Sequence, residues 1–273
     1  MFVFGCMGPL VRAIQLPSTV IACLRAWVSA IALILYLLIS RHEFDRSAAK
    51  RAIVPMIFSG ILIATDWIGL FTAYNYTTIA ISTVFYYVSP VLVFLASPML
   101  LGEKFRLRHL VCAIVSFVGM ALVAGIAENG LPALSEMRGI LFALLGAVSY
   151  AAVILINKKC PEGDPIVRTA IQLTVTALFT TPYILMTSDL SSLQIRMQDI
   201  LLLLVLGVLL TAATYIAYFY LILYIPARSV AIFSYADPVT AVFISAVFLS
   251  EPLSLTGILG SILIIGAAIV SEF

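Results

Sequence analysis

Charged residues are scarce in this sequence. Asp, Glu, Lys and Arg make up 10% of its 273 residues and hydrophobic residues 63%, whereas a soluble domain is about a quarter charged and half apolar. The chain therefore lacks the polar residues that a water-exposed surface needs. Its net charge of +2 does not favour nucleic acid as a partner, because the basic residues are dispersed between apolar stretches.

Residues that hold metals or form disulfides are also few. The two histidines, His42 and His109, are far apart, and no two cysteines form a CxxC motif. A zinc site or a disulfide framework is therefore not expected, and we predict neither a metal nor a bound cofactor. The cysteines are expected to serve as small packing residues, mostly inside apolar runs; they are Cys6, Cys23, Cys112 and Cys160.

Long hydrophobic runs are abundant. A bilayer core about 30 Å thick needs roughly 20 apolar residues per helix, so a chain of this length divides into about ten spans. The runs lack the alternation of barrel strands, which leaves helices to pair the backbone groups in lipid. We predict an all-α integral membrane protein with transmembrane helices at Phe2–Ile14, Ser18–Ile39, Ala52–Tyr74, Thr78–Leu101, Leu110–Ile126, Gly139–Ile156, Thr169–Met186, Ile200–Leu223, Ser229–Leu249 and Leu253–Val270.

The first of these stretches is short for a span. It has about 14 residues before Gln15, or roughly 21 Å of helix. We expect that the true start lies upstream or that the chain was trimmed. A signal peptide is the alternative, but no basic segment and no small-residue cleavage site precede Arg12.

Basic residues are concentrated in alternate loops. The loops after the second, fourth, sixth and eighth spans hold most of the 15 Lys and Arg residues, and the positive-inside rule places such loops in the cytoplasm. Both termini are then cytoplasmic, and a compact protein with short loops suits a bacterial inner membrane. The residues concerned are Arg41, Arg46, Lys50, Arg51, Lys104, Arg106, Arg108, Lys158, Lys159, Arg168 and Arg228.

The chain repeats itself at an offset of 148 positions, which superposes Pro90 on Pro238 and Glu103 on Glu251. Paired prolines within helices and paired glutamates at helix ends are rare coincidences in such a composition. Each repeat holds about five spans, an odd number, so the second repeat has inverted topology, as in carriers whose halves rock about a central site. The predicted repeats are residues 1–126 and 137–273.

Three segments carry a resemblance to a known family: residues 16–35, residues 89–104 with SPVLVFLASPMLLGEK, and residues 237–269 with its glycine-rich end. With the order of helices and the paired Pro and Glu, the sequence resembles the EamA-like members of the drug/metabolite transporter superfamily over nearly its whole length. The resemblance implies a ten-helix secondary transporter, commonly an exporter of metabolites, amino acids or drug-like compounds. The short first helix departs from the family pattern.

Charged residues inside spans are candidate functional positions, because a charge at the bilayer centre costs about 2.5 to 3.5 kcal/mol. Arg25 and Asp66 have similar predicted depths in the second and third spans. They form either a fixed ion pair that closes the outer end or part of a substrate or proton site. Trp67 adds aromatic surface beside them.

Asp237 is the third charged residue within a span, and it directly precedes Pro238. Proline removes a backbone hydrogen bond, so a helix kink near the midplane is expected there and at Pro90. Each kinked span carries a polar stripe. We expect the two stripes to line a cavity, with close packing of small residues as the alternative. The stripes are Ser82, Tyr86, Ser89 and Ser97, and Ser234, Asp237, Ala241 and Ser245.

Tyrosines near these stripes provide aromatic surface that can stack on an organic substrate. Those placed within spans are Tyr86, Tyr87, Tyr215, Tyr218 and Tyr235. Interfacial aromatic belts are the alternative for some of them.

The sequence thus predicts a secondary transporter whose partners are a small-molecule substrate and the lipid bilayer, and the family resemblance implies export. A carboxylic acid in low dielectric exchanges protons nearer to neutral pH, so Asp237 is the candidate for proton coupling. A non-transporting scaffold or receptor and a passive channel remain as alternatives. A membrane-embedded enzyme is disfavoured, because GxSG, HExxH and GxGD-like motifs are absent and neither histidine falls within a predicted span.

Overall fold

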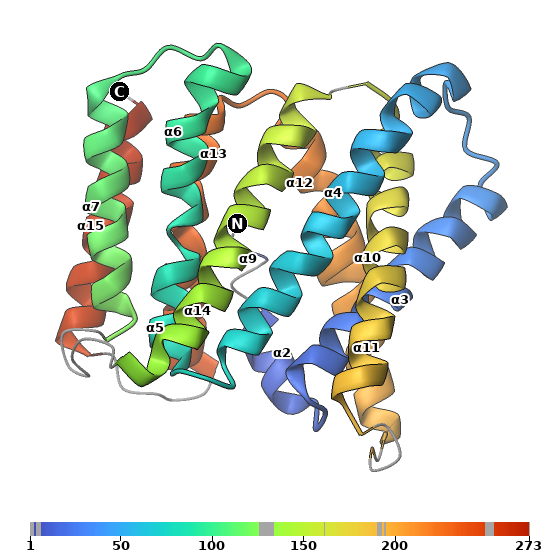
Figure 1. Cartoon of the computed structure of the whole chain (residues 1–273), viewed down its shortest axis with the longest axis horizontal. Helices are drawn as coiled ribbons and strands as arrows, with labels where there is room; N and C mark the ends of the chain where they lie inside the picture. Colours follow the sequence, from blue (N-terminus) through green and yellow to red (C-terminus); the bar gives the residue numbers. More distant parts are fainter. Residues whose placement is uncertain are drawn as a thin grey trace.

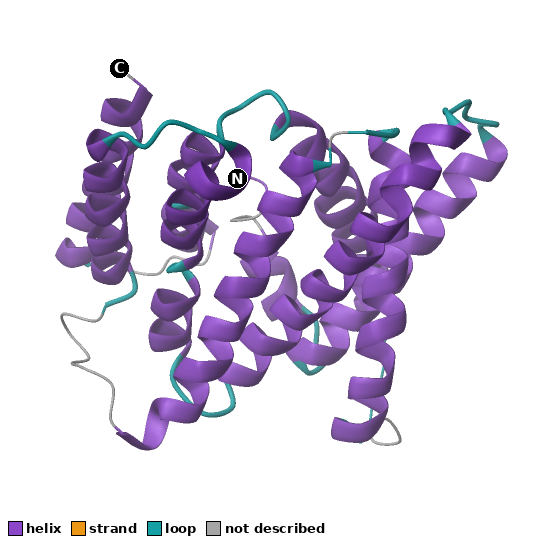
Figure 2. Cartoon of the chain, turned by 45° about the horizontal axis from the view of Figure 1, so that its top comes forward, coloured by secondary structure: helices purple, strands orange, loops and turns teal. Residues whose placement is uncertain are grey.

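The protein is a bundle of helices (Figures 1 and 2). The computed structural model describes residues 3, 7–125, 134–160, 162–189, 193, 195–248 and 254–272, and every regular element in these ranges is helical. The elements are α2 (Met7–Ala13), α3 (Ser18–Ile39), α4 (Arg46–Ala73), α5 (Ile79–Tyr86), α6 (Ser89–Leu101), α7 (Leu107–Val123), the 3₁₀ turn η1 (Leu134–Glu136), α9 (Met137–Lys159), α10 (Pro165–Thr187), α11 (Met197–Gly207), the π-helix η3 (Val208–Ala213), α12 (Thr214–Leu221), α13 (Ala227–Ser234), α14 (Ala236–Phe248) and α15 (Leu255–Glu272).

Length and composition make this a multi-pass membrane protein. Among the described residues, 6 helical stretches are long and apolar enough to cross a bilayer, and α7 and α15 are shorter apolar helices. The outer surface of the bundle carries large apolar side chains. Val54 on α4 is 71% exposed, Leu141 on α9 60% and Met186 on α10 87%. Such a surface is an aggregation hazard in water but is suited to lipid.

Most of the basic residues lie in four turns, or in the helix ends next to them, at one end of the bundle, which is the upper end in Figure 1. The four turns are those between α3 and α4, α6 and α7, α9 and α10, and α12 and α13. This clustering fits the charge pattern on which the sequence prediction of orientation depends.

The sequence analysis placed Arg168 in a loop, as it did several other basic residues that lie in the first or last turns of α4, α7, α9 and α13. Helix α10 begins earlier than predicted, at Pro165, since the Asp164 side chain accepts hydrogen bonds from the backbone N–H groups of Ile166 (2.9 Å) and Val167 (3.2 Å). Asp at the N-cap followed by Pro is a strong helix start. Arg168 therefore lies in the first turn of α10, only 2% exposed.

The predicted start of the fifth span, Leu110, was three residues late, while nothing described contradicts the start of the first span. Helix α7 begins at Leu107, so His109 lies in its first turn and is buried, 3% exposed. In the first predicted span, helix α2 covers Met7–Ala13, and residues 4–6 before it lie outside the described part of the chain.

Helices α7 and α15 pack along each other at the edge of the bundle (Figure 1). Their contact is close because glycines face it: a Cβ at Gly119 would lie 2.7 Å from the carbonyl oxygen of Gly260. Glycine permits such backbone approach between membrane helices. The residues of α7 shifted by 148 positions fall on α15, so this pair joins equivalent helices of the predicted repeats.

Candidate functional site

Two spans are each broken into a pair of short helices near the middle of the bundle. Helix α5 ends at Tyr86 and α6 begins at Ser89, while α13 ends at Ser234 and α14 begins at Ala236. Pro90 and Pro238 lie in the first turn of the second helix of each pair, where the missing N–H of proline costs nothing. The breaks fall at equivalent positions of the predicted repeats, Tyr87 and Tyr235.

These two tyrosines contact each other. Their rings are stacked with centroids 5.8 Å apart, and the Tyr235 hydroxyl donates to the carbonyl oxygen of Tyr87 at 3.0 Å. That carbonyl belongs to the break between α5 and α6, where regular helical bonding is interrupted. The two broken spans thus meet at their breaks, and Tyr235 is fully buried there, 0% exposed.

A chain of aromatic rings extends from this contact. Tyr86 packs against Tyr87 with centroids 5.6 Å apart and against Tyr150 of α9 at 5.9 Å. The Tyr150 and Tyr218 hydroxyls are 3.1 Å apart. The sequence analysis missed Tyr150, although a tyrosine in the middle of an apolar span was the available signal.

The π-helix η3 precedes Tyr215 and Tyr218. The hydroxyl of Thr211 in η3 donates to the carbonyl oxygen of Leu206 at 2.8 Å, five residues back. A π turn rotates the residues that follow it relative to the helix before, and such turns are frequent at functional positions. Here it orients the tyrosines of α12, of which Tyr215 meets Trp67 edge to face with centroids 6.3 Å apart.

Arg25 lies beside these aromatic residues. Its guanidinium carbon is 3.8 Å from the ring centroid of Trp67, a cation–π contact. Asp66 and Tyr215 interact electrostatically with Arg25, but Arg25–Asp66 is not among the ion pairs within 4.0 Å in the described residues. Arg25 Nη1 instead donates to the sulfur of Met7 at 3.5 Å.

Asp66 and Asp237 connect to the same set of tyrosines. The Asp66 carboxyl group interacts with Tyr86 and Arg25, and the Asp237 carboxyl group interacts with Tyr87 and Tyr150. The structure therefore gathers all three charged residues predicted within spans around one group of aromatic side chains.

Several polar atoms in this region are buried and have no hydrogen-bond partner. An unpaired buried polar group is costly, so each one needs an explanation. A polar ligand that binds here would supply the missing partners. The atoms are Arg25 Nε, Asp66 Oδ1, Ser82 Oγ, Ser89 Oγ and Asp237 Oδ1.

The rest of the predicted polar stripes are less open to a ligand. The Ser234 hydroxyl donates to its own helix at Val230 O, 3.0 Å away, and Ser97 does the same at Phe94 O, 3.2 Å away. The side chains of Ala241 and Ser245 lie outside what the structure describes. Serines of these stripes thus divide into some that are bonded within a helix and two that are unpaired, Ser82 and Ser89.

A second buried polar cluster, which the sequence analysis did not predict, joins α4, α9 and α10. The amide of Asn157 donates to Ser59 Oγ (3.1 Å), and the amide of Gln172 donates to Ser59 Oγ (2.8 Å) and Asn157 Oδ1 (3.0 Å). Arg168 Nη2 donates to the backbone oxygen (3.1 Å) and Oδ1 (3.2 Å) of Asn157. We call Ser59, Asn157, Arg168 and Gln172 the three-helix network.

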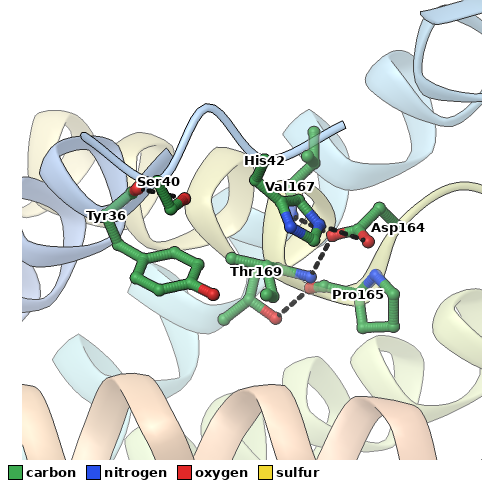
Figure 3. Close-up of polar contacts among 8 residues, drawn as sticks. Tyr36, Ser40, His42, Asp164, Pro165, Val167 and Thr169 are labelled. Atoms are coloured by element: carbon green, nitrogen blue, oxygen red, sulfur yellow. Dashed lines mark hydrogen bonds and ion pairs between the residues drawn. The ribbon is translucent and has the colours of Figure 1, made fainter. Parts of the chain in front are cut away.

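Polar contacts also tie together the turns at the basic end of the bundle. His42 Nε2 lies 2.9 Å from Asp164 Oδ2, so the turn after α3 contacts the turn before α10 (Figure 3). Glu103 accepts a hydrogen bond from the backbone N–H of Ala227 at 2.7 Å and so caps α13. Glu251, its predicted equivalent, lies outside the described residues.

Comparisons with known proteins agree with this architecture. The model of the EamA-like transporter family matches residues 1–125 and again residues 137–272. The chain belongs to the EamA-like transporter family. These two matches cover nearly all of it.

Relatives of this EamA-like protein are themselves described as transporters. It is 25% identical over 252 residues to the uncharacterized transporter YxxF of Bacillus subtilis, covering 91% of this chain and 79% of that protein. It is 27% identical over 251 residues to the uncharacterized transporter YvbV of the same organism, covering 91% and 80%. An uncharacterized transporter of Archaeoglobus fulgidus is 23% identical, over 83% of this chain and 78% of that protein.

The fold also occurs in a solved crystal structure of another protein. The two superpose with a TM-score of 0.87 at 19% identity, over 100% of this chain and 95% of the other. At this level of identity the likeness establishes the fold and nothing about the substrate.

Proposed function

We propose that this EamA-like transporter is a secondary carrier that exports a small organic metabolite, amino acid or drug-like compound by alternating access. It would cross a bacterial inner membrane ten times, as two inverted halves of about five helices, with both termini in the cytoplasm. The substrate would bind among the tyrosines and charged residues where the broken helices meet. A proton carried by Asp237 would couple transport to the pH gradient.

The observation that carries the proposal is the contact between Tyr87 and Tyr235. Each lies at the break of its own span, and the two are equivalent under the repeat. Contact between equivalent residues is expected at a twofold axis relating the halves. The packing of α7 on α15 and the two separate family matches support the same symmetry. Broken helices meeting at such an axis are typical of substrate sites in inverted-repeat carriers.

Transport is tested with purified protein in proteoliposomes. Counterflow of radiolabelled amino acids, nucleosides, sugars and organic cations is measured with and without a pH gradient, with protein-free liposomes as the control. Saturable counterflow of at least one compound is expected. Flux that rises without saturation would indicate a channel, and no flux for any compound would indicate a scaffold or receptor.

The inverted topology has its own test. Arg106 and Ser254 are equivalent at the offset of 148, and both are exposed. In a variant with the native cysteines replaced by serine, Arg106→Cys should react with an impermeant maleimide only from the cytoplasmic side and Ser254→Cys only from the other. Labelling of both from the same side would contradict the inverted repeat.

A further inference from the structure

Arg25 and Asp66 are neighbours of opposite charge that do not satisfy each other. Arg25 is 9% exposed and Asp66 is 3% exposed. They interact electrostatically without forming an ion pair within 4.0 Å. Both are buried deeply enough that each needs a partner for its charge.

The guanidinium of Arg25 retains hydrogen-bonding capacity. Stacking on Trp67 satisfies the face of the guanidinium but uses none of its N–H groups, which lie in its plane. In the described residues its hydrogen bond goes to the Met7 sulfur, a weak acceptor, and Nε has no partner. A planar fork of N–H donors suits a carboxylate better than any other ligand group except phosphate.

Asp66 retains the opposite capacity. Its Oδ1 atom is buried and accepts no hydrogen bond. Tyr86 is hydrogen-bonded to this carboxyl group, and Arg25, Tyr74 and Tyr215 interact with it electrostatically. An ammonium group on a ligand would donate to the free oxygen and balance the charge.

From these observations we infer that Arg25 and Asp66 are the two poles of a binding site for a zwitterion of the amino-acid type. Arg25 would take the carboxylate, Asp66 the ammonium group, and the rings of Tyr86 and Tyr215 would surround the rest of the molecule. The inference rests on the proposed transport function, because only a transported compound has reason to reach these buried groups.

The choice of a zwitterion follows from the charges. A simple anion would meet the Asp66 carboxylate beside Arg25, and a simple cation would meet the Arg25 guanidinium beside Asp66. Either ligand leaves one buried charge opposed and one hydrogen-bonding atom unused. A molecule with both groups completes both poles, as electrostatic complementarity requires for specificity.

The site belongs to one half only. Positions 173 and 214, which lie 148 residues after Arg25 and Asp66, are Leu173 and Thr214. The second half therefore offers no equivalent pair of charges, and a zwitterion would bind in a single orientation.

The experiment compares three forms of one ligand: phenylalanine, phenylalaninamide and N-acetylphenylalanine, with the corresponding leucine series alongside. These are a zwitterion, a cation of equal size, and an anion that is larger by the acetyl group on its nitrogen. Dissociation constants for the detergent-purified protein are measured by ligand-induced thermal shift and calorimetry. The natural protein should bind at least one zwitterion about tenfold or more tightly than its amide and its N-acetyl form, since a charge-assisted hydrogen bond at a buried site contributes about that much.

Two variants assign the poles. Arg25→Gln should remove the preference for the zwitterion over the amide, and Asp66→Asn should remove the preference over the N-acetyl form. Arg25→Lys and Asp66→Glu, which keep the charges, should retain part of each preference. Arg168→Gln, at the buried arginine of the three-helix network, is the matched control and should leave both preferences unchanged.

Three results would overturn the inference: equal affinity for all three forms, no binding of either zwitterion, or equal effects of Arg168→Gln and Arg25→Gln on the preferences. Its failure can be told from failure of the transport proposal. Saturable counterflow of a compound with a single charge would leave the carrier standing without the zwitterion site. Zwitterion binding with the expected variant effects, but no flux, would leave the site without a carrier.

Discussion

Two buried arginines, Arg168 and Arg25, differ in what surrounds them. Both leave Nε without a partner. Arg168 Nη2, however, has two oxygen acceptors on Asn157 within 3.2 Å, whereas Arg25 Nη1 reaches a sulfur and lies beside a carboxyl group and aromatic rings. Buried arginine therefore has two different roles in this protein. Neutral amide oxygens hold Arg168 in the scaffold, whereas Arg25 and the neighbouring Asp66 keep hydrogen-bonding atoms that a ligand can use.

The largest effect is expected at Asp237, in the group of charged and aromatic residues that also contains Arg25 and Asp66. Asp237→Asn removes the proposed proton carrier while keeping the size of the side chain, so stimulation of flux by a pH gradient should be abolished and counterflow at equal pH should persist. Initial rates in proteoliposomes measure both. Thr240→Val is the control, one turn further along α14, because its hydroxyl donates within its own helix, to Ala236 O at 2.9 Å. Undiminished stimulation in Asp237→Asn would remove Asp237 from coupling.

A large loss of stability is expected from substitution of Arg168 in the three-helix network. Arg168→Met takes the Arg168 donor from the backbone oxygen of Asn157 and one of two donors from its Oδ1, which keeps Gln172. Losing both charged hydrogen bonds should lower the free energy of unfolding by about 3 kcal/mol. Arg25→Met removes no hydrogen bond to oxygen and should cost less. Thermal denaturation of the two variants in detergent compares them. An equal or larger loss for Arg25→Met would contradict the contrast between the two arginines.

Packing beside the three-helix network provides a smaller effect. A Cβ at Gly60 would lie 2.6 Å from Gln172 O and 2.8 Å from the Val175 Cβ, so Gly60→Ala should separate α4 from α10 at a cost of about 2 kcal/mol. Gly266→Ala is the matched control, because in the described part of the chain no atom beyond its own helix backbone lies within 4 Å of its added Cβ. Thermal denaturation should show a lower melting temperature for Gly60→Ala alone. Equal melting temperatures would show that this helix contact is not tight.

The smallest effect is expected at the basic end of the bundle. His42 and Asp164 are each partly exposed, at 27% and 22% of their side chains. His42→Ala should therefore lower the free energy of unfolding by less than about 1 kcal/mol, and added salt should reduce the difference further. Denaturation at low and high ionic strength measures it. A loss larger than that of Gly60→Ala would assign this contact a structural role that its exposure does not predict.

Much of the helical layout is accessible from sequence. The apolar runs place the helices, because in lipid the length of a run and its bounding charges decide where a helix can lie. The start of α10 was missed because the charge of Arg168 outweighed the helix-start signal of Asp164 and Pro165. Its burial depends on Asn157, 11 residues earlier, in another helix.

The sequence predicts several residues of the candidate site but not the contacts between them. A charge or a tyrosine inside an apolar run marks a position, and Arg25, Asp66 and Tyr235 follow from that rule. Hydropathy does not reveal partners. That Arg25 stacks on Trp67, and that Tyr150 meets Tyr218, depends on how separate helices pack against each other, which no local pattern encodes.

The hydrogen bond from Tyr235 to Tyr87 has one more consequence, because it is directional. Tyr235 donates to the carbonyl of Tyr87, and among the described residues no bond runs from the Tyr87 hydroxyl to the carbonyl of Tyr235. If the two halves exchange conformations during a transport cycle, the hydrogen-bond donor and acceptor must exchange as well, so that Tyr87 donates to the carbonyl of Tyr235. Replacing one of the two tyrosines by phenylalanine would then change the relative populations of the two conformations, which open to opposite sides of the membrane. Which tyrosine is replaced would decide which conformation is favoured.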